Sequence, residues 1–480
     1  MKKSIISMLG GMLSDRSAME KFEQAYKEAE ERERKNSDNF FDINAKDASE
    51  MARTNRYIPE YDKEYLEKIM NRIVGELCEK TYGIRVRNGI MSELQPKKIG
   101  GHQQDVTVED LEKIPVHIRP QLTGTLQHND LNGSSGEHLA EEYKKYLQET
   151  DPKKKRFLYG HFRQGMDILD IDPLLYELLG RNRNNMGYWL PPITYAAAKH
   201  GFFKIPDTVL VKVPPTVLQM TRLEYMSLNP ATLKIIDDWA MHVFELDVQK
   251  EYFVKTGIFS SKFDFRNAKI SGEKEVRELG EYLIFIQNYA TSLAGPLVVD
   301  GEGKPSSHYG AATTNEFAVR EFIADKEDNP CIYNGMPLHT EYRVFIEFFG
   351  NGEFEILGIS PYWRKDVMLQ RFSQGPDKDT AKMRHDFLIY AAHEKTLYKR
   401  YNENAEKVLI NIAEMAPDIK LTGQWSLDVM QNGDDFYIID MAEAAQSALQ
   451  DCVPAGRIRK MKEYWFPESV EQMMLEEKNE

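Results

Sequence analysis

The first clear hydrophobic pattern in the chain has the spacing of a helix. Between Asp62 and Lys80 the apolar residues recur every four positions and therefore share one helix face. These residues are Tyr65, Ile69, Ile73 and Leu77. The stretch from Ser14 to about Lys35 is dense in Glu, Lys, Arg and Ala and has no Gly or Pro, so it also predicts a helix. Residues 95–137 are polar and broken by prolines and by a Gly-Ser cluster, which predicts loops.

The pattern changes after the charged run from Asp151 to Arg156, which is typical of a solvated linker. Strand-like and helix-like segments alternate from there on. The predicted helices are Ile193–His200, Glu273–Leu293, Asp379–Lys399 and Asn404–Met415. We predict an α+β fold in three parts: a mostly helical, loop-rich region at 1–155, a second region at 156–240, and a main strand-rich region at 241–480.

Runs rich in β-branched and aromatic residues predict strands in the second and third parts. Short polar or glycine-containing turns join several of these runs into hairpins. The predicted single strands are Phe157–Phe162 and Phe317–Ile323. The predicted hairpins are Tyr252–Phe265 with its turn at Ser260-Ser261, Thr340–Phe349 with Glu353–Ile359, and Trp425–Met430 with Phe436–Met441.

Composition narrows the class of protein. The chain has 480 residues with 41% hydrophobic and 29% charged residues, which is typical of a globular protein of about three domains. A net charge of −14 repels a phosphate backbone and argues against non-specific nucleic-acid binding. Charges interrupt every apolar run, so no membrane span or signal peptide is predicted. The three cysteines, Cys78, Cys331 and Cys452, lie far apart, and we expect reduced thiols and a cytoplasmic location.

Carboxylates in the last hairpin are the first candidates for chemistry. Asp428 and Asp440 interrupt strands that are otherwise Leu, Val, Tyr and Ile, where a carboxylate is costly without a partner. Paired strands can bring these two carboxylates together on one face, with Glu443 close behind, to form a site for a hard cation such as Mg²⁺. The same residues could instead face water at a strand end or bind an arginine of the core.

Basic residues on earlier strands suggest an anionic ligand. Lys255, Arg320 and Arg343 all lie in strand-like segments between apolar neighbours. Lysine and arginine both suit phosphate oxygens, and the turn from Gly257 to Ser261 could add backbone N–H groups. A structural salt bridge is the alternative for each of these cations.

These segments, in this order from about Ile193 to Ala445, resemble the ATP-grasp superfamily. The resemblance rests on a lysine-ending strand before a mobile turn, a hinge strand with an acidic residue, an arginine-bearing strand and a closing pair of metal-binding strands. The matching segments are Phe253–Gly257, Val319–Ile323, Glu341–Phe345, Trp425–Val429 and Ile438–Met441. The chain departs from the family where an asparagine usually follows the last acidic residue by two positions, because Ala442 stands there.

The resemblance implies that residues 241–480 form the ATP-binding region and its carboxy-terminal tail, with an antiparallel-sheet nucleotide cleft that binds ATP and Mg²⁺. It places residues 156–240 before this region, on the substrate side. It also implies a ligase that activates a carboxylate as an acylphosphate and joins it to an amine, with a small molecule or peptide as substrate. The implied nucleotide-binding residues are Lys212, Lys255, Arg320, Glu321, Phe322 and Ile323. Arg343 is the implied catalytic residue at the phosphates, and the implied metal ligands are Asp428, Asp440 and Glu443.

Two other functions remain open from the sequence. Lys255-Thr256-Gly257 is a fragment of the motif in which a lysine takes AMP covalently, so a nucleotidyltransferase is one alternative. The other is a non-enzymatic assembly protein with a degenerate nucleotide-binding domain, to which the helical region at 1–155 could contribute an interaction surface.

Overall fold

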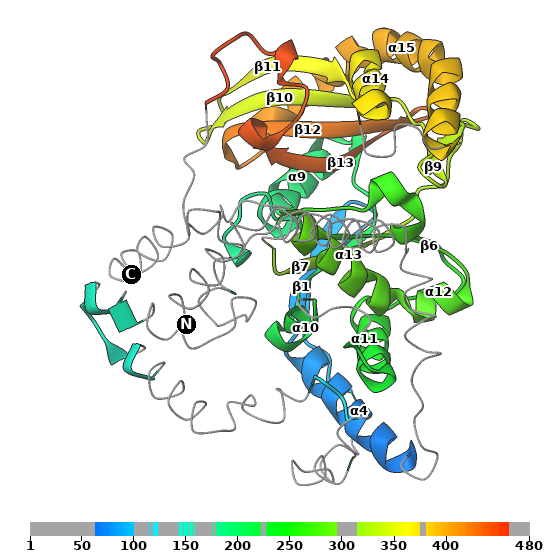
Figure 1. Ribbon diagram of the computed structural model, residues 1–480. Coiled ribbons are helices and arrows are strands. Elements are labelled where there is room, and N and C mark those ends of the chain that lie inside the picture. The colour runs from blue at the N-terminus through cyan, green and yellow to red at the C-terminus, as the bar shows by residue number, and fades with distance from the viewer. Residues whose placement is uncertain are drawn as a thin grey trace, which may run out of the picture.

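The computed structural model describes residues 63–99, 179–221, 227–294, 314–374 and 381–459, with short pieces between 114 and 176. The described chain combines helices with two large sheets, one above the other in Figure 1, which confirms the predicted α+β class. The predicted helix at Ser14–Lys35 lies outside the described residues. No helix among the described residues has both the length and the apolar character needed to cross a bilayer.

The first sheet has six strands, all paired antiparallel, in the order β2-β1-β4-β7-β5-β6. Its strands are β1 (Tyr82–Arg87), β2 (Ile90–Leu94), β4 (Thr208–Lys212), β5 (Tyr252–Thr256), β6 (Lys269–Ile270) and β7 (Glu316–Glu321). The predicted amino-terminal region thus contributes a hairpin to this sheet as well as helix α4 (Lys63–Glu79).

The second sheet has five strands in the order β11-β10-β12-β13-β3. Its strands are β10 (Glu341–Phe349), β11 (Phe354–Pro361), β12 (Thr422–Asn432), β13 (Asp435–Glu443) and the short β3 (Phe203–Lys204), which runs parallel to β13. Both hairpins predicted here, β10–β11 and β12–β13, are confirmed. A separate two-stranded ribbon pairs β8 (Cys331–Ile332) with β9 (Met336–Pro337).

Helices cover the sheets on their outer sides and fill part of the space between them (Figure 1). They are α9 (Met186–His200), α10 (Pro215–Met220), α11 (Pro230–Val243), α12 (Glu273–Arg277), α13 (Leu279–Ala294), α14 (Lys365–Gln374) and α15 (Ala381–Met415). Helix α15 is continuous where two helices were predicted, and the predicted helix from Glu273 is interrupted at Glu278.

Two predicted strand segments differ from the structure. Phe157 and Leu158 are helical, and the rest of the strand predicted there lies outside the described residues. The hairpin predicted at Tyr252–Phe265 is longer, because a 3₁₀ helix (Lys262–Asn267) precedes β6, the strand that pairs with β5.

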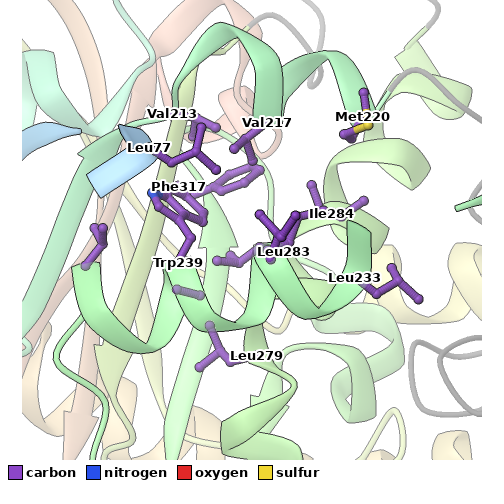
Figure 2. Packing of buried hydrophobic residues seen from close by; sticks show 14 of the residues in the cluster. Leu77, Val213, Val217, Met220, Leu233, Trp239, Leu279, Leu283, Ile284 and Phe317 are labelled. Atoms are coloured by element: carbon purple, nitrogen blue, oxygen red, sulfur yellow. The ribbon is translucent and has the colours of Figure 1, made fainter. Parts of the chain in front are cut away.

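Successive residues of each strand point to opposite faces of its sheet, and helices cover one of these faces. In the six-stranded sheet, Val254, Phe317 and Val319 belong to the same hydrophobic core as Trp239 of α11 and Leu283 of α13. Figure 2 shows Phe317, Trp239 and Leu283 within this core. Residues one position further along, such as Lys255 and Arg320, therefore project from the other face. That face turns toward the five-stranded sheet.

Candidate functional site

A cleft with a cavity volume of about 140 Å³ lies between the two sheets. Its apolar lining includes Phe253, Phe265, Phe322, Met336 and Met430. Its charged lining includes Lys255, Arg320, Glu341, Asp428 and Asp440 from the two sheets, and Lys262 from the 3₁₀ helix. The apolar side chains suit a flat ring, and the charged groups suit an anion with a counter-ion.

Lys255 enters the cleft from the last residue but one of β5 and is almost completely buried, with 2% of its surface exposed. Its ammonium group lies 3.0 Å from Oδ1 of Asp440, its one side-chain partner in the described part of the chain. Burial lowers the pKa of Lys255, and the nearby Asp440 carboxylate offsets this effect only in part. The site therefore favours additional negative charge beside Lys255.

Arg320, on the neighbouring strand β7, is a second buried cation with 5% of its surface exposed. Its Nη1 donates to the carbonyl of Ile439 at 2.6 Å, whereas its Nε has no hydrogen-bond partner among the described residues. Burial lowers the pKa of Arg320 to about 10. A buried guanidinium group with an unused donor is a favourable place for an anionic oxygen.

Asp428 and Asp440 are directly opposite each other on β12 and β13, and both line the cleft. The structure thus brings together the two carboxylates that the sequence suggested would share one face. Asp428 is buried, whereas 41% of the Asp440 side chain is exposed. Partial desolvation opposes ionisation of Asp440, but Lys255 and Arg320 together lower its pKa, so it is a carboxylate at neutral pH.

A β-bulge gives Asp440 this orientation. The register passes from Asp428 opposite Asp440 to Val429 opposite Ile438, which leaves Ile439 as an extra residue. Phe436 and Ile438 face the core before the bulge, and strict alternation would have directed Asp440 toward that core as well. Because of the extra residue, the side chains after the bulge point to the opposite face from the one that strict alternation predicts, and Asp440 points into the cleft.

Arg343 pairs with Asp428 across β10 and β12 through two hydrogen bonds, Nε to Oδ1 at 2.7 Å and Nη2 to Oδ2 at 2.6 Å. Burial lowers the pKa of Arg343, but the Asp428 carboxylate outweighs burial and raises it. The guanidinium group also lies over the ring of Tyr362, 4.8 Å from the ring centroid. Asp428 is therefore bound to an arginine, as one of the interpretations of the sequence anticipated.

Glu443 lies away from the two aspartates. It is opposite Trp425, on the face of β13 that carries Met441 and the core. Its Oε1 binds Arg183 at 3.0 Å, and its Oε2 has no partner among the described residues. Burial raises the pKa of Glu443. The bulge that directs Asp440 into the cleft leaves Glu443, three residues later, on the opposite face.

Lys212 also lies apart from the described residues that line the cleft. Its ammonium group binds Glu316 at 2.6 Å and Asn315 at 3.1 Å. The second carboxylate oxygen of Glu316 accepts from the backbone N–H of Gly187, in the first turn of α9. Lys212 thus neutralises a buried acid that caps a helix.

The three hinge residues Glu321, Phe322 and Ile323 all line the cleft. The amides of Glu321 and Phe322 donate to the carbonyls of Asp207 and Glu251. The side chain of Glu321 binds Lys250 at 2.7 Å. Ile323 is therefore the first hinge residue whose amide has no intramolecular acceptor in the described part of the chain.

The turn after Lys255 is internally bonded. The amides of Gly257, Ile258 and Phe259 donate to the Glu316 carbonyl or to the Thr256 hydroxyl. Ser260 is the residue of this turn that reaches the cleft. The backbone N–H groups expected to surround phosphate are thus mostly committed elsewhere in this conformation.

Two charged residues of the cleft were missed by the sequence analysis. Lys262 lies in the 3₁₀ helix, where a strand was predicted, and its ammonium group binds the Tyr362 hydroxyl and lies 4.3 Å from that ring centroid. Glu341 has 9% of its surface exposed, and burial raises its pKa to about 7. Glu341 could have been found, because it precedes Arg343 by two residues and so shares its face of the strand.

Asp325, Glu327 and His339 lie close enough together to hold a metal ion, and His339 lines the cleft. These groups already have protein partners. Asp325 accepts from the amide and the side chain of Asn329, and Glu327 binds Arg400 at 3.3 Å. We interpret the cluster as a structural polar network.

No protein-family model matches the sequence, and no curated protein matches it in a sequence search. Among solved structures, Cdc123 from Schizosaccharomyces pombe is 12% identical with a TM-score of 0.32, covering 55% of this chain and 86% of that chain. D-alanine-D-alanine ligase from Helicobacter pylori is 12% identical with a TM-score of 0.24 and coverages of 54% and 51%. N5-carboxyaminoimidazole synthetase from Staphylococcus aureus, solved with ADP, is 10% identical with a TM-score of 0.24 and coverages of 60% and 56%. These similarities are too distant to assign a family.

Proposed function

We propose that the cleft binds ATP with Mg²⁺ and that the protein uses ATP to join a carboxylate to an amine or similar nucleophile. The observation that carries this proposal is the pair of buried cations, Lys255 and Arg320, which line one cleft together with the carboxylates Asp428 and Asp440 and with several apolar side chains. A nucleoside triphosphate has matching halves, a flat ring and a chain of anionic oxygens. The ATP-grasp-like order of motifs in the sequence agrees with this assignment.

In this proposal the nucleobase lies among Phe253, Phe265 and Phe322, and the free amide of Ile323 donates to its edge. The phosphates lie against Lys255 and Arg320. Both cations project from the middle of a sheet, so their positions are fixed before the ligand arrives. Such preorganised positive charge stabilises a transferring phosphoryl group without a protein nucleophile.

The donor set fits Mg²⁺. Asp428 and Asp440 present carboxylate oxygens from adjacent strands to one cleft, and Mg²⁺ is commonly held by one or two carboxylates together with substrate phosphates. When bound, Mg²⁺ would neutralise charge on the phosphate oxygens and orient them. Glu443 is left out of this set, because it faces the core and binds Arg183.

The ligation would proceed in two balanced displacements. A substrate carboxylate oxygen attacks the γ-phosphorus of ATP, the bond to the β-phosphate oxygen breaks and ADP leaves. The amine then attacks the carbonyl carbon of the acylphosphate, the bond from that carbon to the phosphate oxygen breaks, and inorganic phosphate leaves with the bonding electrons and takes up the proton that the amine nitrogen loses. Arg343 binds Asp428 and is not itself among the described residues that line the cleft. We propose that it stabilises the anionic oxygens of the transferring phosphoryl group when Asp428 binds the metal.

The test is ATP binding by calorimetry in the presence of Mg²⁺, followed by a screen for ADP release against amino acids and peptides in pairs. We expect saturable binding of ATP and ADP release that depends on both a carboxylate and an amine. Absence of binding would exclude the proposal.

A second candidate is a protein that binds ATP without turning it over. Two features of the metal-binding strand favour this function. Ala442 stands where the family usually has an asparagine, so an amide ligand is missing. Glu443 binds Arg183 on the core face, so its carboxylate does not join the metal ligands. Saturable ATP binding with no ADP release for any substrate pair would support this function over ligation.

A further inference from the structure

The charged groups proposed to hold the metal and the triphosphate are bound to one another in the structure. Lys255 binds Asp440 at 3.0 Å, and Arg343 binds Asp428 through two hydrogen bonds of 2.7 and 2.6 Å. Each pair joins a cation assigned to phosphate and a carboxylate assigned to metal. The two pairs lie side by side, because Asp428 and Asp440 are opposite residues of adjacent strands.

A metal ion arriving alone would meet carboxylates whose charge is already neutralised. To bind both of them, it would have to displace Lys255 and Arg343 from their partners. Lys255 is 2% exposed and would then be a buried ammonium group without a counter-ion, which is costly. The same reasoning applies to a metal-free triphosphate, because its binding to Lys255 and Arg343 would leave Asp428, 4% exposed, without a cation.

When metal and triphosphate arrive together, all four groups can exchange partners at once. The cations move from carboxylate to phosphate, the carboxylates move from cation to metal, and no buried charge is left unpaired. Arg320 does not take part in this exchange, since its Nη1 binds a backbone carbonyl and its Nε is free among the described residues.

We propose that the ion pairs Lys255–Asp440 and Arg343–Asp428 make the binding of metal and the binding of triphosphate depend on each other, so that the site rejects either ligand alone. This inference rests on the proposed ATP-binding function. The coupling is reciprocal, as any linkage between two ligands must be: each ligand raises the affinity for the other by the same factor. In this state Asp440 competes with phosphate for Lys255, and Lys255 competes with metal for Asp440.

The first arm of the test uses Asp440→Asn and ATP in EDTA. Asparagine keeps the size of the side chain but removes the charge that occupies Lys255. We expect this variant to bind metal-free ATP on the order of tenfold more tightly than the wild-type chain, and to lose most of the effect of Mg²⁺ on affinity. Unchanged metal-free binding in Asp440→Asn would show that this carboxylate does not compete with phosphate for Lys255.

The second arm uses Lys255→Met and Mn²⁺ alone, with free Mn²⁺ measured by electron paramagnetic resonance. Removal of the ammonium group leaves the Asp440 carboxylate without its cation, so we expect Mn²⁺ to bind on the order of tenfold more tightly than to the wild-type chain. The matched control for both arms is Asp435→Asn. Asp435 lies on the same strand but binds Lys204 and Lys326 outside the cleft, so neither affinity should change.

The outcomes separate this inference from the function on which it rests. If the wild-type chain does not bind ATP with Mg²⁺, the proposed function fails. If it binds ATP with Mg²⁺ but Asp440→Asn binds metal-free ATP no more tightly, the ion-pair coupling is wrong and the function stands. Should Asp440→Asn fail to fold, the Mn²⁺ arm decides, and unchanged Mn²⁺ affinity in Lys255→Met overturns the coupling.

Discussion

Lys255 and Lys212 are both strand lysines in the same sheet, yet their environments predict opposite consequences of substitution. Lys255→Met replaces a buried ammonium group with an apolar side chain of similar length, and the Asp440 carboxylate that loses its partner is 41% exposed to water. We expect the melting temperature to change little and the affinity for ATP with Mg²⁺ to fall by about tenfold to a hundredfold. Calorimetry and thermal unfolding of the variant measure both quantities.

Lys212→Met is the contrasting variant. It leaves Glu316, 1% exposed, with the Gly187 amide as a partner but without a cation. Breaking a buried pair on one side costs about 3–5 kcal/mol, so we expect a clearly lower melting temperature with unchanged ATP affinity per folded molecule. If Lys212→Met bound ATP more weakly, Lys212 would belong to the nucleotide site, as the family resemblance implied.

Glu341 predicts a pH dependence of stability. Burial raises the pKa of Glu341 from 4.5 to about 7 in the folded chain. A raised pKa means that its contribution to stability is fully present below pH 4.5 and is lost as pH rises through 7. At 1.36 kcal/mol per pKa unit, the unfolding free energy of the wild-type chain should fall by about 3 kcal/mol between pH 4.5 and pH 7 because of Glu341. The Glu341→Gln variant should not show this fall. Denaturant unfolding at several pH values measures it.

Glu347 provides the matched control on the same face of β10. Burial opposes its ionisation, but Gln424 and Arg459 lower the pKa of its carboxyl group. Its contribution to stability is therefore lost as pH falls, in the opposite sense to Glu341. If Glu341→Gln and the wild-type chain show the same pH profile, the carboxyl group of Glu341 is not destabilised by burial.

At the scale of single elements, the sequence predicts those strands whose turns carry a clear signal. Gly350 and Gly352, with φ of +84° and +92°, supply the backbone conformations that the β10–β11 turn needs. The same type of signal was overlooked earlier in the chain. Asn88 and Gly89, with φ of +51° and +73°, form the turn between β1 and β2, and an Asn-Gly pair between apolar runs favours such a hairpin.

The bulge in β13 explains why the candidate site was only partly predictable. Alternation can place Asp428 and Asp440 on one face, but it does not reveal which residue is extra. The sequence does show that the alternation of apolar and polar residues is interrupted here. Ile438 and Ile439 are adjacent apolar residues, and the alternation resumes at Met441 on the core face. Lys262 could not be assigned from pattern, because its 3₁₀ helix has no hydrophobic period of its own.

The turn after β5 is expected to be rigid. A Cβ atom at Gly257 would lie 2.5 Å from the Thr314 hydroxyl and 2.8 Å from Cβ of Glu316. Gly257→Ala should therefore destabilise the chain by about 1–3 kcal/mol, by displacing β7 residues that also support α9. Unfolding by chemical denaturant measures this loss of stability. The control is Gly201→Ala, because no atom lies within 4 Å of a Cβ added at Gly201. Comparison of the two variants separates the steric effect from the backbone effect.

Gly201 has a φ of +76°, so alanine there carries only the strain of a left-handed conformation. A larger loss of stability at Gly201 than at Gly257 would contradict a close-packed turn.

At the scale of the whole molecule, each of the two sheets contributes its own charged groups to the cleft. The six-stranded sheet contributes the buried cations Lys255 and Arg320, and the five-stranded sheet contributes Asp428 and Asp440. The chain passes between the two sheets from β2 to β3, from β3 to β4 and again from β7 to β10. A ligand that satisfies both sets of charges must therefore contact both sheets, and its binding free energy links them.

This division predicts how ATP with Mg²⁺ should stabilise the chain. A ligand present at a hundred times its dissociation constant adds about 2.7 kcal/mol to the unfolding free energy, and the added stability should grow with the logarithm of ligand concentration. Because the site is shared, hydrogen-exchange protection should increase on β5 and β7 and on β12 and β13 at the same ligand concentration. Protection confined to the cationic sheet would mean that the carboxylates of Asp428 and Asp440 do not engage the ligand, and that the triphosphate is held without the metal-binding half of the cleft.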